Sequence, residues 1–463
     1  MIAASLCFRL LFVGSYGLWS DELVAVLSAK GQYPIEATNE KEISTKQLEA
    51  LNTLPQVIKS TNYYDSGNAI VYTTSLHYWL NLFGRSEVTA RLLSILCSML
   101  SVVVLYRLVV LLFKSSTAAL FSAMLFAIHP LSIEYAQQAR SYSMAVLFSL
   151  TSTYYFFSGL KFKKNSQFFW YALFSLLALL THYLTIGILL AQGLIFLIVR
   201  PTKKISIAVL FSAGASLLLF FIWLKTGGAD GLKMMAQRNA TFTQLAHSPA
   251  AQQNTFFLPA SFANISAGAV QVLLQICGNL LQDLNFKLRE ILILLAVPLS
   301  ILLIAVRQLY KAQSNTIGLL AKVLLFVLVH LLFSTALAIQ AKHCISFQPL
   351  YANFVVPYMC IALGFSITTI LKHSALFSFQ VALVTALPLL FVLSLLPVYT
   401  GQNGRLPKHR KYAVMAKQLE RQDTVVVNSF GTAQLLFLYT NKNLSQVYRL
   451  NSNLKSDTAI SIK

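Results

Sequence analysis

Two adjacent carboxylates follow the first apolar stretch of the chain, in the tetrapeptide Trp19-Ser20-Asp21-Glu22. The chain has 463 residues and only 15 of them are acidic, so the place of this pair is informative. A carboxylate pair at a bilayer surface suits general-base chemistry on a substrate that arrives in the lipid phase. We therefore expect Asp21 and Glu22 to lie in a site at the membrane boundary.

A second polar cluster occupies the short segment 129–142, between two apolar runs. An arginine guanidinium matches the oxygens of a phosphate group bidentately, so Arg140 is a candidate for phosphate binding. The alternative interpretation is that Arg140 extends to the lipid headgroups. The other polar and aromatic candidates in this segment are Glu134, Tyr135, Gln138 and Tyr142.

The composition of the chain indicates the class of protein in which these candidate residues lie. Hydrophobic residues make up 56% of the chain and charged residues 11%, and the mean hydropathy is +0.65. Apolar runs of roughly 17–25 residues recur, which is the length that crosses a bilayer as a helix. The sequence therefore predicts an all-α, polytopic membrane protein. Its net charge of +21 lies in short clusters between the apolar runs, a pattern typical of membrane topology and not of nucleic-acid binding.

Hydropathy predicts about eleven transmembrane helices. Only eight residues precede Arg9, which makes the first span short and suggests a start further upstream. The predicted spans lie near 2–18, 86–113, 117–131, 141–160, 167–181, 184–199, 205–224, 290–306, 318–338, 348–371 and 375–397.

Basic residues predict the orientation of these spans in the inner (plasma) membrane. The turns that carry Lys114, Lys163 and Arg200 fall on one side, which the positive-inside rule makes cytoplasmic. The loops 19–85 and 225–289 then lie on the extracytoplasmic face. The candidate residues fall on that face as well.

Two domains are expected, a transmembrane domain over 1–400 and a small extracytoplasmic α/β domain over 401–463. The helical spacing of apolar residues in 411–420 predicts a helix. The β-branched run in 423–428 predicts a strand.

Three motifs together resemble a known family. They are Trp19-Ser20-Asp21-Glu22 after an Arg-bearing span, Phe83-Gly84-Arg85-Ser86-Glu87 followed by Arg91, and His129-Pro130 followed by the segment 135–142. In order and spacing they are similar to the bacterial protein O-mannosyltransferase and aminoarabinose-transferase group (glycosyltransferase family 39-like) of the GT-C glycosyltransferases. The likeness is specific over residues 9–200, and Thr181-His182-Tyr183 adds to it weakly.

The resemblance implies a GT-C-like membrane enzyme that takes a sugar from a polyprenyl-phosphate carrier. It implies that the acceptor is an extracytoplasmic hydroxyl of a glycolipid, glycan or protein, and that the transfer inverts the anomeric carbon. It implies that Asp21, beside Glu22, is the general base. It places Arg140 and Arg91 near the donor phosphate. The residues expected to position substrates are Glu134, Tyr135, Gln138, Tyr142 and His182.

The chain departs from the family pattern at two places. Gln138 stands where many relatives carry a glutamate, and Glu134 is a candidate substitute one helical turn earlier. The segment 348–351 lacks the Arg-Tyr pair of relatives. These departures keep a non-catalytic GT-C-like scaffold subunit open as an alternative, beside a lipid or glycan transporter.

A divalent cation is a possible cofactor, because histidines on the expected outer side could join Asp21 or Glu134 as ligands. The histidines are His77, His182 and His343. No Gly-rich phosphate loop or DxD-like motif is present, which argues against a nucleotide-sugar donor and agrees with a lipid-linked one.

Overall fold

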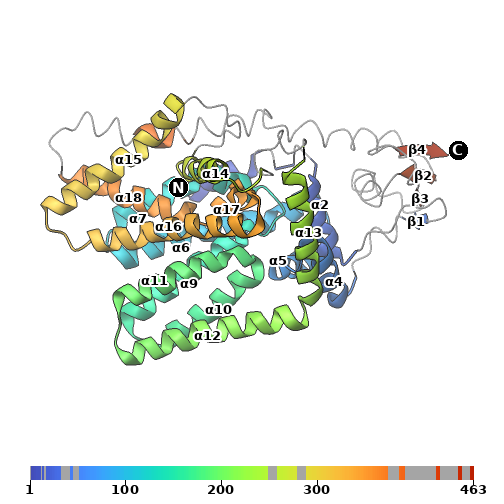
Figure 1. Cartoon of the computed structure of the whole chain (residues 1–463), viewed down its shortest axis with the longest axis horizontal. Coiled ribbons are helices and arrows are strands. Elements are labelled where there is room, and N and C mark those ends of the chain that lie inside the picture. Colours follow the sequence, from blue (N-terminus) through green and yellow to red (C-terminus); the bar gives the residue numbers. More distant parts are fainter. Residues whose placement is uncertain are drawn as a thin grey trace.

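The computed structural model describes residues 2–11, 13–14, 17–32, 42–44, 52–248, 258–278, 288–373, 385–389, 391, 424–427, 447–450 and 459–462. These residues form a helical bundle and a small β-sheet that lies at one end of the molecule (Figure 1). The predicted all-α membrane domain is therefore confirmed in its helical, apolar character.

The bundle consists of long apolar helices joined by short turns. The serines at 86 and 115 cap two of them, because their hydroxyls accept hydrogen bonds from the N–H groups of Thr89 and Ala118. The bundle helices are α6 (Glu87–Phe113), α7 (Ser116–Ile128), α9 (Tyr142–Phe162), α10 (Asn165–Thr181), α11 (Ile186–Val199), α12 (Lys203–Thr226), α15 (Leu288–Lys311), α16 (Ile317–Ala341) and α18 (Val356–His373).

Shorter helices surround the bundle. Pro130 starts α8, since proline fits the first turn of a helix, and α8 is bent by 56° from α7. The shorter helices are α1 (Ile2–Leu10), α2 (Ser20–Lys30), α4 (Leu54–Asp65), α5 (Ile70–Phe83), α8 (Pro130–Ala136), η1 (Tyr183–Thr185), α13 (Ala229–Ala246), α14 (Phe262–Ile276), η3 (Ile345–Phe347) and α17 (Pro349–Ala352).

Helices are found at most of the predicted spans, but fewer of them are long and apolar enough to cross a membrane. Among the described residues, α6, α12 and α16 are long and apolar enough, and the bent pair of α7 and α8 makes a fourth. In the first predicted span, 2–18, the described residues form only the nine-residue α1. Most of the last one, 375–397, lies outside the described residues. Eleven crossings therefore stay a prediction.

Close packing and paired hydroxyls hold the bundle together. A Cβ atom on Gly364 of α18 would lie 2.3 Å from the Ser122 hydroxyl of α7, so glycine is needed for this close approach. Deeper in the bundle the Thr153 hydroxyl lies 2.7 Å from that of Tyr358, and Gln192 Nε2 donates to Thr153 at 3.0 Å. Such pairs satisfy polar groups that lipid would leave unpaired.

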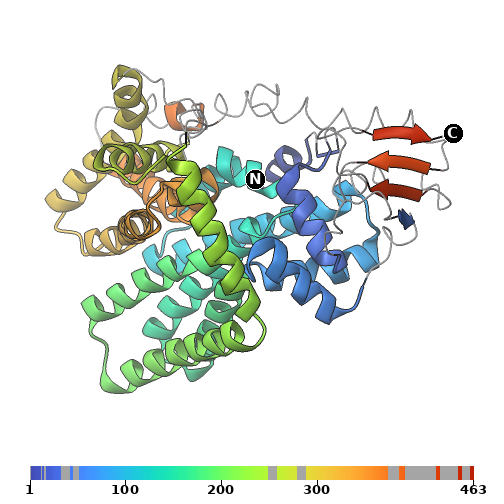
Figure 2. The ribbon, with the colours of Figure 1, turned by 45° about the vertical axis from the view of Figure 1, so that its right-hand side comes forward.

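The small sheet joins two distant parts of the chain. Its order is β1 (Glu42–Ser44), β3 (Val447–Leu450), β2 (Thr424–Val427) and β4 (Ala459–Ile462), with β2 and β3 parallel and the other pairs antiparallel (Figure 2). The predicted strand at 423–428 is confirmed by β2. The predicted helix at 411–420 lies outside the described residues. Because β1 comes from the first loop, the sheet is not formed by the expected domain 401–463 alone.

Candidate functional site

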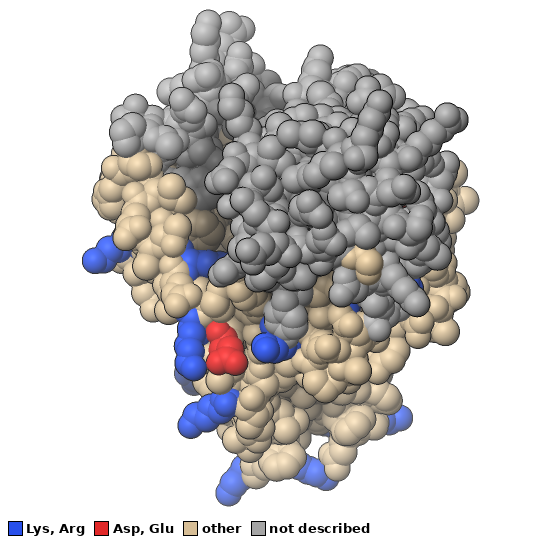
Figure 3. Space-filling model, turned by 90° about the vertical axis from the view of Figure 1, so that its right-hand side faces the viewer, with Lys and Arg blue, Asp and Glu red and all other residues tan. Residues whose placement is uncertain are grey.

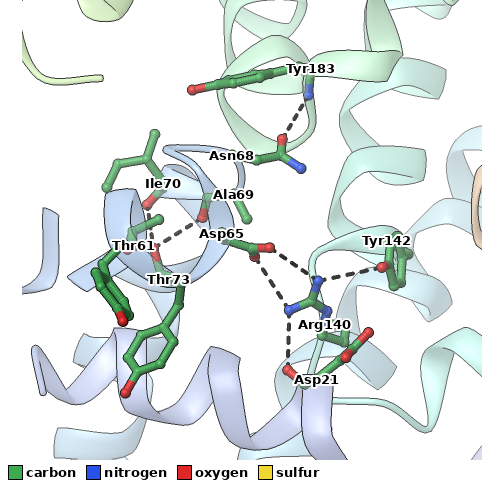
Figure 4. Close-up of polar contacts among 12 residues, drawn as sticks. Asp21, Thr61, Asp65, Asn68, Ala69, Ile70, Thr73, Arg140, Tyr142 and Tyr183 are labelled. Carbon is green, nitrogen blue, oxygen red and sulfur yellow. Dashed lines mark hydrogen bonds and ion pairs between the residues drawn. The ribbon is translucent and has the colours of Figure 1, made fainter. Parts of the chain in front are cut away.

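Three of the predicted site residues, Asp21, Arg140 and Tyr142, lie together with Asp65 where four segments of the chain meet (Figure 4). The first turn of α2 carries Asp21, and the loop between α8 and α9 carries Arg140. The end of α4 contributes Asp65, and α9 begins with Tyr142. Residues from distant parts of the sequence therefore form one polar centre.

Arg140 is the hub of this centre. Its Nη1 lies 3.3 Å from Asp65 Oδ2 and donates to the main-chain oxygen of Asp21 at 3.1 Å. Its Nη2 donates to Asp65 Oδ1 at 3.4 Å and reaches the Tyr142 hydroxyl at 3.5 Å. The Nε atom is buried and has no hydrogen-bond partner within the described part of the chain. The guanidinium is thus held by long contacts and keeps one donor for a ligand.

The charge of Arg140 is stabilised by its surroundings. Burial opposes that charge, but Asp65, Tyr142 and Asp21 outweigh the effect and raise the pKa of Arg140 well above the ordinary value of an arginine. The carboxylate of Asp21 therefore lies within electrostatic reach of the guanidinium. Asp21 is itself partly exposed. A partly exposed carboxylate next to a fixed positive charge suits a general base whose partner is an anionic ligand.

Glu22 has a different place from its neighbour. Its carboxylate is fully buried and accepts from Arg91 Nε at 2.8 Å and Arg91 Nη2 at 2.7 Å. Glu22 Oε1 also accepts from the main-chain N–H of Ala139 at 2.8 Å, next to Arg140. The pair of Glu22 and Arg91 therefore connects α2, α6 and the loop that carries Arg140.

Arg91, which is expected near a donor phosphate, lies in the protein interior. Arg91 is fully buried, and its remaining donors reach the main-chain oxygens of Val13 at 2.7 Å and Gly17 at 2.9 Å. Glu22 is buried to the same extent, and its carboxylate forms an ion pair with Arg91 at 2.7 Å. A direct role of Glu22 in catalysis and a role of Arg91 at the donor phosphate stay predictions.

Aromatic side chains form one wall of the centre. The ring of Tyr142 lies 5.2 Å from that of Tyr135 and 5.8 Å from that of His182. His182 in turn lies 5.7 Å from Tyr351 and 4.9 Å from Phe354. The segment 348–351, which departs from the family pattern, thus brings a tyrosine to the site.

His182 is a neutral imidazole. Burial, helped by the positive charge of Arg140, lowers its pKa to about 3. Its Nδ1 atom accepts a hydrogen bond from the main-chain N–H of Leu184 at 3.3 Å. The proton of the ring is therefore on Nε2, which makes that atom a donor.

Two polar candidates lie within the protein interior. Gln138 is 3% exposed, and neither atom of its amide group has a hydrogen-bond partner among the described residues. Glu134 is buried on α8. The carboxylate that forms an ion pair with Arg140 comes from Asp65. The expected substitution by Glu134 stays a prediction.

Sequence reasoning missed Asp65. The sequence does distinguish Asp65 as a candidate, because it is one of the few acidic residues of the chain. It follows two tyrosines at the end of a helical stretch in the loop 19–85. Nothing in the sequence alone pairs it with Arg140, which lies 75 positions later.

A divalent cation would need a cluster of ligating side chains. Among the residues that the structure describes, no three His, Cys, Asp or Glu side chains gather in this way. The Nδ1 atom of His77 lies 2.8 Å from the main-chain oxygen of Ala29, and His343 Nε2 lies 3.0 Å from Asn239 Oδ1. A divalent cation therefore stays an expectation.

Comparisons with known proteins agree with this architecture. Residues 69–224 match the sequence model of the family described as dolichyl-phosphate-mannose-protein mannosyltransferase. No curated protein matches the chain in sequence.

Two solved structures share the fold. ArnT from Cupriavidus metallidurans, bound to undecaprenyl phosphate, has a TM-score of 0.56 and 11% identity, over 95% of this chain and 84% of that one. The oligosaccharyltransferase of Archaeoglobus fulgidus in its apo form has a TM-score of 0.52 and 9% identity, over 91% of this chain. The chain spans only 58% of the length of that second protein.

The resemblance seen in the sequence is thus confirmed at the level of fold and group. The chain has the fold of the GT-C glycosyltransferases, and its residues 69–224 carry the sequence pattern of the dolichyl-phosphate-mannose-protein mannosyltransferase family.

Proposed function

We propose that the protein is an integral-membrane glycosyltransferase that moves a sugar from a polyprenyl-phosphate carrier to an acceptor hydroxyl on the extracytoplasmic face of the inner membrane. The observation that carries the proposal is the placement of Asp21 beside Arg140, with Asp65 on the same guanidinium. A base and a phosphate-binding cation next to one another are what this transfer requires.

The reaction is a single inverting displacement. The acceptor oxygen attacks the anomeric carbon of the sugar, and its proton passes to the carboxylate of Asp21. The bond between the anomeric carbon and the phosphate oxygen breaks, and polyprenyl phosphate leaves with the electron pair. Arg140 stabilises the negative charge that develops on that phosphate.

The unpartnered Nε–H of Arg140 supports this role, since it is a buried donor that a phosphate oxygen would satisfy. The neighbouring contacts to Asp65 and Tyr142 are 3.3–3.5 Å long and can be exchanged for shorter ones. Glu22 and Arg91 keep the loop of Arg140 in place through the bond from Ala139 to Glu22.

The remaining candidates position the substrates. His182 presents its Nε2–H from the aromatic wall that it shares with Tyr135 and Tyr142. Gln138 offers both a donor and an acceptor. The acceptor is a glycolipid, a glycan or a protein on the same face as the loop 19–85.

The test is sugar transfer by the purified full chain. The chain is placed in liposomes with membrane extract as the source of acceptor, and a panel of radiolabelled undecaprenyl-phosphate sugars is offered. We expect one donor to be used by the wild type and none by Asp21→Asn, because an amide cannot accept the proton. Equal melting temperatures of the two proteins would show that the variant is folded.

Each other outcome is decisive. Equal turnover by wild type and Asp21→Asn would contradict the assignment of Asp21 as base. Transport of label across the liposome without transfer would favour the transporter alternative. Silence of both proteins with every donor, together with binding to a glycosyltransferase partner, would favour the scaffold subunit.

A further inference from the structure

A groove of about 620 Å³ runs between α10 and α12 on the outside of the bundle. Its walls are apolar, and some of the wall residues are highly exposed, Phe169 at 63% and Phe211 at 77%. Asn165 and Lys204 lie at one end of it. The main apolar residues that line it are Phe169, Leu173, Leu176, Ile207, Phe211 and Leu219.

The length of the groove fits a lipid chain. From Lys204 to Leu219 the helix α12 rises about 22 Å at 1.5 Å per residue. One half of the hydrocarbon core of a bilayer is about 15 Å thick. The groove can therefore hold an acyl chain from the headgroup region to beyond the bilayer midplane.

The end of the groove at Lys204 is strongly basic. Lys163, Lys164 and Lys203 are exposed near the starts of the same two helices. No acidic residue occurs anywhere between Glu134 and Asp230 to balance them. This end therefore carries positive charge and attracts an anionic headgroup.

The helix starts add to that attraction. The residues that precede α10 and α12 are Lys164 and Thr202, and neither makes a side-chain hydrogen bond to the first turn of its helix. The helix dipoles of α10 and α12 place partial positive charge at these starts, which favours an anion there.

We propose that this groove binds an anionic glycerophospholipid of the surrounding membrane. Its phosphate lies at the starts of α10 and α12 against Lys204 and Lys164, and one acyl chain fills the space between Phe169 and Phe211. Charge complementarity selects an anionic lipid over a zwitterionic one.

This lipid is distinct from a sugar carrier at the candidate active site. The helix α10 begins at the basic end of the groove and ends at Thr181, directly before His182. His182 belongs to the aromatic wall beside Arg140. The phosphate of the proposed lipid is thus at the opposite end of α10 from Arg140.

The test is native mass spectrometry of the purified full chain in a mild detergent. Phosphatidylglycerol or phosphatidylcholine with identical acyl chains is titrated in. We expect one phosphatidylglycerol to be retained per chain, and phosphatidylcholine to bind at least tenfold more weakly. Equal retention of the two lipids would overturn the proposal.

Paired variants locate the lipid. Lys204→Glu reverses the charge at the basic end, and Lys225→Glu makes the same change at the other end of α12. Ala208→Phe fills the groove, and Leu218→Phe adds the same ring on an exposed face that does not line it. We expect the affinity for phosphatidylglycerol to fall at least tenfold in Lys204→Glu and Ala208→Phe only.

The melting temperature of each variant in phosphatidylcholine checks that it is folded. If either groove variant keeps the wild-type affinity for phosphatidylglycerol, or if the control variants lose it equally, the lipid does not lie in this groove.

Discussion

Asp65 approaches the guanidinium of Arg140 with both carboxylate oxygens, 3.3 Å from Nη1 and 3.4 Å from Nη2. The two side chains are only 9% and 14% exposed. Asp65 therefore fixes the direction of the cation that faces the proposed donor phosphate. It also shares this cation with Asp21, so the charge at the site is set by two carboxylates and one guanidinium.

The first prediction concerns this pair. Asp65→Asn should lower kcat of sugar transfer by about tenfold or more, about 1.4 kcal/mol of activation free energy, because Arg140 loses its orienting partner. Initial rates at saturating donor measure it. Asp230→Asn is the matched control, because the pair of Asp230 and Lys233 is 77% exposed on both sides and its loss should leave the rate unchanged.

The second prediction separates Glu22 from Asp21. Glu22→Gln should destabilise the protein by about 3–5 kcal/mol, because it leaves the charge of Arg91 buried without its carboxylate. Asp21→Asn should change stability by less than about 1 kcal/mol, since Asp21 is partly exposed. Melting temperatures in one detergent compare the two.

A double variant tests the origin of that loss. Glu22→Gln combined with Arg91→Met removes both charges and should regain part of the stability. The stability losses of Glu22→Gln and Arg91→Met, each measured alone, are added for comparison. If the double variant loses as much stability as this sum, Glu22 and Arg91 act independently and the proposed coupling between them is wrong.

The helices were predictable from the sequence because their signals are local. The predicted span 86–113 coincides with α6, Glu87–Phe113, since a long apolar run between polar turns fixes both its ends. The number of membrane crossings does not follow from these signals, because a run such as α11 is apolar but only 14 residues long. Length and composition alone do not distinguish a short span from a buried helix.

The roles within the site were less predictable, because they depend on contacts between distant residues. Asp21 and Glu22 are neighbours with the same chemistry, and only the position of Arg91, 69 positions later, shows which of them is buried. In the same way Tyr351 joins the site through His182. Such pairings follow from tertiary packing, which one sequence does not reveal.

Figure 3 shows the distribution of charged side chains on one face of the molecule. On the face at the sheet end of the molecule, basic side chains outnumber acidic ones among the residues described (Figure 3). This agrees with the net charge of +21.

The third prediction concerns pH. The pKa of His182 in the folded protein is about 3, below its ordinary value of 6.5. Between these two values the unfolded chain binds a proton that the folded protein does not bind, so stability falls as the pH is lowered from 6.5 toward 3. The slope contributed by this one proton approaches about 1.4 kcal/mol per pH unit.

Replacement of the imidazole checks the assignment. The asparagine of His182→Asn does not titrate. The melting temperature of this variant should therefore fall less steeply than that of the wild type as the pH is lowered from 6.5 to 4. His247→Asn is the comparison, since His247 is an exposed residue at the end of α13. An unchanged slope in His182→Asn would show that this histidine is not held neutral by the fold.

The last prediction concerns the buried amide of Gln138, which has no partner among the described residues. An unpaired buried amide costs about 1–3 kcal/mol. Gln138→Met keeps the length of the side chain and removes that cost, so it should raise the melting temperature. If the amide serves to bind a substrate hydroxyl, the same variant should raise the KM for sugar transfer.

Gln137→Met is the matched control for this argument, because Gln137 Nε2 donates to the main-chain oxygens of Phe8, Arg9 and Leu11 at 2.8–3.3 Å. Its loss should lower the melting temperature. A stabilised and fully active Gln138→Met would mean that the amide binds no substrate. A destabilised one would mean that Gln138 has a structural partner. Only higher stability together with weaker substrate binding fits an amide that the fold leaves unpaired for a ligand.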